Sequence, residues 1–121
     1  MMKTRTLVLT ATLMFGGLAF AAQKNQTYTG EIMDSACAKT GSHEAMMKAH
    51  PNMKTAKDCT QGCVKAGSSY VLYDSASKTA YTLDDQKMPE RFAGEEVTVT
   101  GKLDPATHTI HVENIKAGAR G

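Results

Sequence analysis

The sequence contains no tryptophan and only four tyrosines and three phenylalanines among its 121 residues. Aromatic side chains supply much of the apolar area that a core buries, so we expect one small domain with a modest core. Cysteine occurs three times, an odd number that cannot pair completely within one chain. A domain of this size would gain stability from a crosslink or a bound metal.

A surplus of basic charge is also absent once the first residues are set aside. The chain has 14 basic and 12 acidic side chains, and Lys3 and Arg5 account for the formal net charge of +2. Proteins that bind nucleic acids normally carry a basic stripe or patch, and the sequence has neither. The composition therefore predicts no nucleic-acid partner.

Long hydrophobic runs are absent except for one near the N-terminus. Two basic residues precede an uncharged, largely apolar run at residues 6–22, which is too short to span a bilayer and is followed by polar residues. The Ala-Phe-Ala sequence at 19–21 matches the small-x-small rule for signal-peptide cleavage. We therefore expect residues 1–21 to be a signal peptide, and residues 22–121 to be one periplasmic or secreted domain without a membrane span.

The rest of the chain contains five short runs that are typical of β-strands. Apolar and polar residues alternate within them, at residues 26–33, 69–73, 79–83, 96–103 and 109–115. A polar loop at 74–78 joins the second and third runs as a hairpin, and the segment with Pro89 and Phe92 fits a short helical turn with Phe92 inward. Gly30, in the middle of the first run, indicates a bend or a close backbone approach. The tail at 117–121 is expected to be disordered.

Five short strands with a helical turn between the third and fourth predict a mainly β fold, a five-stranded OB-like small barrel. Such a barrel closes off its sheet edges, which suits a small exported protein. Residues 34–67 would then form a helical, cysteine-containing insertion between strands one and two. OB folds often use this connection to bind ligands.

Two helices are predicted within the insertion, at residues 43–49 and 56–66. Pro51 disfavours helical geometry at the residue before it and so ends the first helix. Thr55-x-x-Asp58 resembles a capping box and begins the second helix, which Gly67 would end as the C′ residue.

The cysteines are the residues most suited to chemistry. Cys59 and Cys63 are four positions apart, so on a helix they share a face with Cβ atoms about 5–6 Å apart. A disulfide needs a Cβ separation of about 3.5–4.5 Å, so these two do not bond each other while the helix holds. Both can point toward a third group, which is either Cys37 or a metal ion.

Three interpretations of this set stay open. In the first, Cys37 forms a disulfide with Cys59 or Cys63, stabilises the fold by on the order of 3 kcal/mol and leaves one thiol over. In the second, the three cysteines and either His43 or His50 bind zinc or copper, which favour thiolate and imidazole ligands. In the third, the odd cysteine takes part in thiol redox exchange.

Histidines and methionines also recur within the insertion at spacings of three or four. The set consists of His43, Met46, Met47, His50 and Met53. It predicts either a copper-binding face, since thioethers and imidazoles bind copper, or an amphipathic helix that buries methionine against the barrel.

Three patterns resemble a family of small exported bacterial proteins of unknown function with an OB-like barrel. They are G-E-I-x-D-S-x-C at 30–37, C-x-x-x-C-V-x-x-G-x-x-Y-V-L at 59–72 and F-A-G-x-x-V-T-V-T-G at 92–101. The resemblance implies an exported, OB-like protein and supplies no reaction. The sequence has no G-x-S-x-G, H-E-x-x-H or phosphate-loop motif. It therefore favours a binding or structural module of the cell envelope, whose partner is a small molecule, a metal or an envelope component, over an enzyme.

Overall fold

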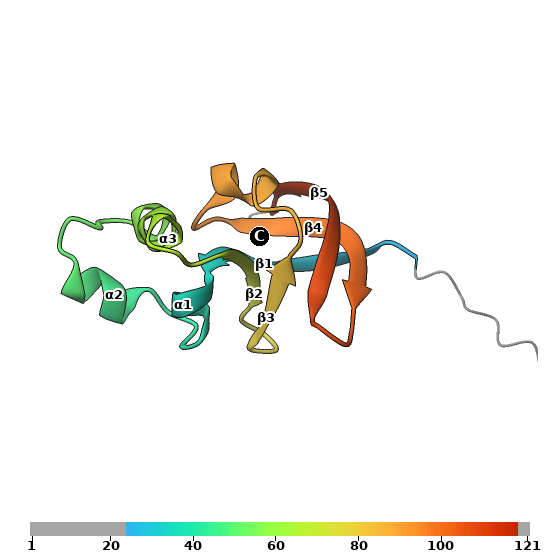
Figure 1. Ribbon diagram of the computed structural model, residues 1–121, viewed down its shortest axis with the longest axis horizontal. Helices are drawn as coiled ribbons and strands as arrows, with labels where there is room; N and C mark the ends of the chain where they lie inside the picture. Colours follow the sequence, from blue (N-terminus) through green and yellow to red (C-terminus); the bar gives the residue numbers. More distant parts are fainter. Residues whose placement is uncertain (1–23, 119–121) are drawn as a thin grey trace, which may run out of the picture.

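The computed structural model describes residues 24–118 (Figure 1). The predicted signal peptide at 1–21 lies outside the described residues, as do residues 119–121 of the predicted disordered tail. The first residues of that tail are ordered, because Ala117 ends a strand and Gly118 N–H donates to the carbonyl oxygen of Glu96 at 2.9 Å. Among residues 24–118, no helix combines the length and the apolar character that a bilayer span requires.

The strands begin and end within two residues of the predicted positions. They are β1 (Gln26–Asp34), β2 (Tyr70–Asp74), β3 (Thr79–Leu83), β4 (Glu96–Asp104) and β5 (Thr109–Ala117). The helical segments are α1 (Ser35–Ala38), α2 (Glu44–Ala49), α3 (Ala56–Lys65) and a short 3-10 helix, η1 (Met88–Phe92). Both predicted helices of the insertion and the predicted turn between the third and fourth strands are confirmed, whereas α1 was not predicted.

The five strands close into a ring in the order β1-β2-β3-β5-β4, with β4 paired back onto β1. The neighbours are antiparallel except β3 and β5, which run parallel over two residue pairs. The prediction of a mainly β fold with a β2–β3 hairpin is therefore confirmed. The three α-helices lie together at one end of the ring, beside β1 and β2 (Figure 1).

Two groups of buried side chains lie on opposite faces of β1 and β2. The larger fills the ring and includes Ile32, Leu72, Leu83, Val97, Val99, Ile110 and Ile115. The smaller lies between these strands and the helices, and consists of Met33, Cys37, Ala38, Cys59, Cys63 and Val71. Successive residues of a strand point to opposite faces, so Ile32 enters the first group and Met33 the second. The same two strands thus build the ring and support the cysteines.

Gly30 pairs with β4 and directly precedes Glu31, the residue at which β1 passes from pairing with β4 to pairing with β2. A Cβ atom at this position would overlap the backbone carbonyl oxygen of Tyr73, which cannot move without disturbing the β1–β2 ladder. The predicted close backbone approach at Gly30 is therefore confirmed.

We expect Gly30→Ala to lower the free energy of unfolding by about 2 kcal/mol or more, because overpacking against backbone cannot relax cheaply. Urea unfolding measures this change. Thr29→Ala, at the exposed neighbouring position, is the matched control and should change stability by less than about 0.5 kcal/mol. Equal stability of Gly30→Ala and wild type would contradict the close approach.

Asp84 connects the end of β3 to β5, where strand pairing is shortest. Its carboxylate accepts a hydrogen bond from the N–H of Val112 at 2.8 Å and lies 3.0 Å from Nδ1 of His111. The hydrogen bond from the Val112 N–H lowers the pKa of the Asp84 carboxyl below its ordinary value; burial opposes this shift, and His111 adds to it. The ionised carboxylate therefore stabilises the folded state.

Because the folded-state pKa of Asp84 is depressed, its contribution is present above the unfolded-state pKa of about 3.9 and is lost as the pH falls through the folded-state value. We expect Asp84→Ala to destabilise the protein at pH 7 by less than about 1 kcal/mol, since the side chain is 42 % exposed and solvent screens it. The difference from wild type should shrink below pH 4 in urea unfolding curves. A difference that is constant from pH 7 to pH 3 would contradict this linkage.

Candidate metal centre

Local capping interactions position the α3 cysteines. The side-chain oxygen of Thr55 accepts from the N–H of Asp58 at 3.1 Å, and the Asp58 carboxylate accepts from the N–H of Lys54 at 3.2 Å. The predicted start of this helix is therefore confirmed, and Gly67 follows its end with a φ of +116°. Within the helix, the four-residue spacing turns Cys59 and Cys63 toward β1.

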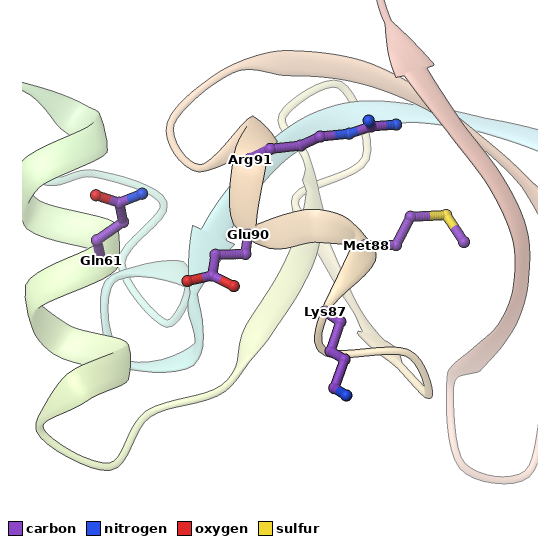
Figure 2. A pocket seen from close by; sticks show the side chains of 5 residues that line it. All are labelled: Gln61, Lys87, Met88, Glu90 and Arg91. Atoms are coloured by element: carbon purple, nitrogen blue, oxygen red, sulfur yellow. The ribbon is translucent and has the colours of Figure 1, made fainter.

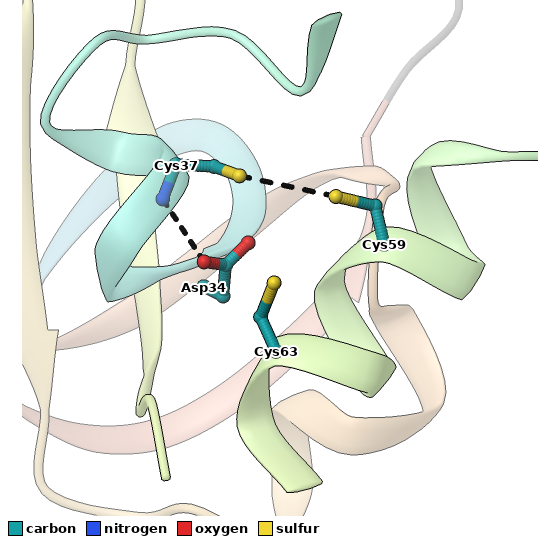
Figure 3. Close-up of side chains that lie close together, drawn as sticks. All are labelled: Asp34, Cys37, Cys59 and Cys63. Carbon is teal, nitrogen blue, oxygen red and sulfur yellow. Dashed lines mark hydrogen bonds between the residues drawn. The ribbon is translucent and has the colours of Figure 1, made fainter. Parts of the chain in front are cut away.

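The third cysteine is positioned by a helix cap that the sequence patterns did not predict. Asp34, the last residue of β1, is the N-cap of α1, and its Oδ2 accepts a hydrogen bond from the N–H of Cys37 at 2.9 Å. The chain turns sharply there, so the Cys37 thiol points toward α3 (Figure 3). The Asp34 side chain itself is completely buried.

These elements bring four potential ligands together. One oxygen of Asp34 and the sulfur atoms of Cys37, Cys59 and Cys63 all lie within 4.8 Å of one another (Figure 3). The Sγ atoms of Cys37 and Cys59 are 3.8 Å apart. Cys59 has no exposed surface, and Cys37 and Cys63 are 4 % and 6 % exposed. We call this set of four residues the thiol–carboxylate cluster.

The predicted disulfide from Cys37 to Cys59 or Cys63 is not formed, and all three thiols are free. A disulfide requires a sulfur separation of about 2.05 Å, well below the 3.8 Å between Cys37 and Cys59. The ends of the insertion are instead held by Ser35 and Ser69. The Ser35 N–H donates to the Ser69 carbonyl at 2.8 Å, and the Ser69 N–H donates to the Ser35 hydroxyl at 3.1 Å. These two hydrogen bonds join the beginning and the end of the insertion.

Burial makes negative charge costly within the cluster. Removal from water, followed by the nearby Asp34 carboxylate, raises the pKa of the Cys37 thiol above its ordinary value. The same two causes raise the pKa of Cys63 to about 11. Asp34 Oδ1 is buried and accepts no hydrogen bond from the residues that the structure describes. A bound cation would satisfy this oxygen and favour the thiolate forms.

The predicted histidine ligands do not join the cluster. His43 is mostly buried, and its Nε2 lies 2.8 Å from a carboxylate oxygen of Glu31 on β1. His50 is exposed at the C-terminal end of α2. Asp34 stands where a histidine was expected as the fourth donor. The available signal was its place three residues before Cys37, the spacing of a helix N-cap to the N–H it binds.

A shallow surface hollow lies apart from the cluster, between α3 and η1. Its lining consists of Gln61, Lys87, Met88, Glu90 and Arg91 (Figure 2). Glu90 points toward α3, whereas Arg91 points away from it. This hollow contains charges of both signs and none of the cysteines, so it adds nothing to the metal-ligating set.

Comparison with known proteins supports a domain of unknown function. A family described as "Protein of unknown function (DUF5818)" matches residues 62–118. That segment contains the last four strands and Cys63, but it begins after Asp34, Cys37 and Cys59. No curated protein and no solved structure matched the chain.

Proposed function

We propose that the protein is an exported metal-binding module whose thiol–carboxylate cluster binds one zinc or copper ion. The observation that carries this proposal is the buried convergence of three thiols and one carboxylate within 4.8 Å. Thiolates suit both metals, and a carboxylate is a common additional ligand of zinc. The donor set therefore fits the two metals that the sequence predicted, zinc and copper, with Asp34 in place of histidine.

The sulfur spacing favours a single ion over a multinuclear cluster. A tetrahedral site with metal–sulfur bonds of about 2.3 Å has sulfur atoms about 3.8 Å apart. The Cys37 and Cys59 sulfur atoms already lie 3.8 Å apart. One ion between them would need little rearrangement of α1 and α3, and this preorganisation supports a specific site.

A hydrogen bond or a capped helix holds each of these ligands in position. Asp34 Oδ2 holds the Cys37 N–H, which leaves Oδ1 to face the ion. Cys59 and Cys63 are fixed by the capped helix α3. Such supporting contacts orient metal ligands and raise affinity. The bound ion would then tie the insertion to the end of β1 in the way that a disulfide was expected to do.

The architecture and the N-terminus support the rest of the proposal. The strand order, the helical turn after β3 and the insertion between β1 and β2 are consistent with an OB-like barrel. The signal-peptide pattern at residues 1–21 supports export to the periplasm or the medium. In this proposal the metal site occupies the connection that OB folds use for ligands.

An equilibrium titration of the reduced protein tests the metal site. We expect one equivalent of zinc to bind per chain, and ion at 100 times the dissociation constant to stabilise the fold by about 2.7 kcal/mol. His43→Ala is the matched control and should bind one equivalent as well, because His43 pairs with Glu31 and not with the cluster. Absence of both zinc and copper(I) binding in a folded, fully reduced sample would refute the proposal.

A further inference from the structure

Resting on the proposed metal site, we propose that the ion it acquires is copper(I), and that the ion reaches the thiols through a layer of methionine thioethers. The layer consists of Met46, Met47 and Met53, which remain partly exposed and pack against the smaller buried group, the one that contains the three cysteines. We call these three residues the methionine layer. The proposal assigns them a role in metal uptake in addition to packing.

The position of the methionine layer follows from the burial of the thiols. The cysteines have at most 6 % of their surface exposed, so an ion arriving from water meets almost none of that surface directly. On the strand side they are backed by Met33 and Val71, both buried. The partly buried apolar residues packed against this smaller buried group are the methionine layer and Tyr73. Because these side chains contact both the buried group and the solvent, the proposal places the path to the thiols along them.

Met53 lies directly on the helix that carries two of the thiols. A Cβ atom at Gly62 would lie 2.5 Å from the Met53 methyl carbon and 3.8 Å from its sulfur. Gly62 precedes Cys63 in the middle of α3, where glycine costs about 1 kcal/mol relative to alanine. The glycine thus leaves room for the Met53 thioether on the surface of α3.

The segment that carries the other two thioethers is weakly held. Helix α2 has no buried residue, and its N-cap, His43, makes no side-chain capping hydrogen bond. The hydrogen bond between His43 and Glu31 joins this end of α2 to β1. Few buried contacts mean a low free energy for local opening, so α2 can shift without disturbing the ring.

Thioether chemistry selects the ion. Methionine sulfur and cysteine thiolate are soft ligands that favour copper(I), whereas zinc in proteins is bound by thiolate, imidazole and carboxylate. A path lined with thioethers therefore accelerates the uptake of copper(I) and gives zinc no intermediate ligand. Within the cluster the three thiolates bind copper(I), and Asp34 keeps its hydrogen bond to the Cys37 N–H.

The test is the rate at which the reduced protein takes copper(I) from its bicinchoninate complex without oxygen, compared with the rate of zinc uptake. In a variant with Met46→Leu, Met47→Leu and Met53→Leu, leucine preserves the apolar volume and removes the sulfur. We expect this variant to take up copper(I) at least tenfold more slowly and zinc at the wild-type rate. Met88→Leu, which alters the hollow beside η1, is the matched control.

Two outcomes overturn the proposal: an unchanged copper(I) rate in the triple variant, or an equal slowing of copper(I) and zinc. Single Met47→Leu and Met53→Leu variants, with intermediate rates expected, decide the matter if the triple variant is unstable. Cys59→Ser separates this proposal from the one on which it rests. If Cys59→Ser still binds both ions with wild-type affinity, the thiol–carboxylate cluster is not the metal site. If the methionine variants bind copper(I) with normal affinity and at a normal rate, the metal site stands and only the methionine path is refuted.

Discussion

Replacing Cys59 by serine should lower the affinity for zinc more than a hundredfold. Within the thiol–carboxylate cluster, Cys59 and Asp34 have no exposed surface. The sulfur atom of Cys59 faces the sulfur atom of Cys37. A serine hydroxyl is a poor zinc ligand, and losing even an outer partner of a ligand typically costs 10–100-fold in affinity. Competition with a chromophoric chelator measures the change.

The matched control is a substitution that removes a potential ligand from the same insertion. His50→Ala removes an exposed imidazole that does not reach the cluster, and its affinity should stay within twofold of wild type. Cys63→Ser should show a loss similar to that of Cys59→Ser. If His50→Ala weakened zinc binding as much as the cysteine variants, the ligand set derived from the structure would be wrong.

The affinity should also rise by about 100-fold or more per pH unit between pH 5.5 and pH 7.5. Burial, and after it Asp34, raises the pKa of Cys37, and the pKa of Cys63 is raised to about 11. In the metal-free protein both thiols are therefore protonated over this range, and each must release its proton to bind as thiolate. Protons compete with the metal, so affinity increases with pH, and potentiometric or calorimetric titration at several pH values measures the slope.

A cysteine variant gives this prediction its internal control. Cys63→Ser removes one of the two thiols whose pKa is raised, so the slope should decrease by about one proton per ion bound. Zinc binding that is independent of pH from 5.5 to 7.5 would mean that thiols are not the ligands.

The sequence predicted the ring better than it predicted the site. Strand positions follow from alternation over a few neighbouring residues, and the start of α3 follows from Thr55 and Asp58, which are three positions apart. Gly30 could be recognised because glycine within a strand is costly unless something occupies the space of a side chain. These features are local, so one sequence suffices to find them.

The errors arose where distant residues decide the outcome. The expected disulfide followed from the small core and the exported context, but the insertion is clamped by Ser35 and Ser69, which are 34 positions apart. Histidine was chosen as a fourth ligand by residue type. The residue that joins the thiols is Asp34, because its role as the N-cap of α1 places its carboxylate beside the cysteines of α1 and α3. Such a position depends on the turn after β1 and not on residue preference.

The methionines show the same limit. Their spacing predicted either a copper-binding face or packing against the barrel. In the structure the methionine layer packs on the smaller buried group, which contains the three cysteines, and not on the side chains that fill the ring. Periodicity indicates that a face is buried, but only the fold determines what that face contacts.

The most direct test of the central claim is X-ray absorption at the zinc edge, measured on reduced protein that has been loaded with one equivalent of zinc. The thiol–carboxylate cluster predicts three sulfur neighbours at about 2.3 Å and one oxygen neighbour at about 2.0 Å. In the Asp34→Ala variant the zinc ion should keep its three sulfur neighbours, and another ligand should replace the Asp34 oxygen. A first shell that contains only nitrogen and oxygen would contradict the account.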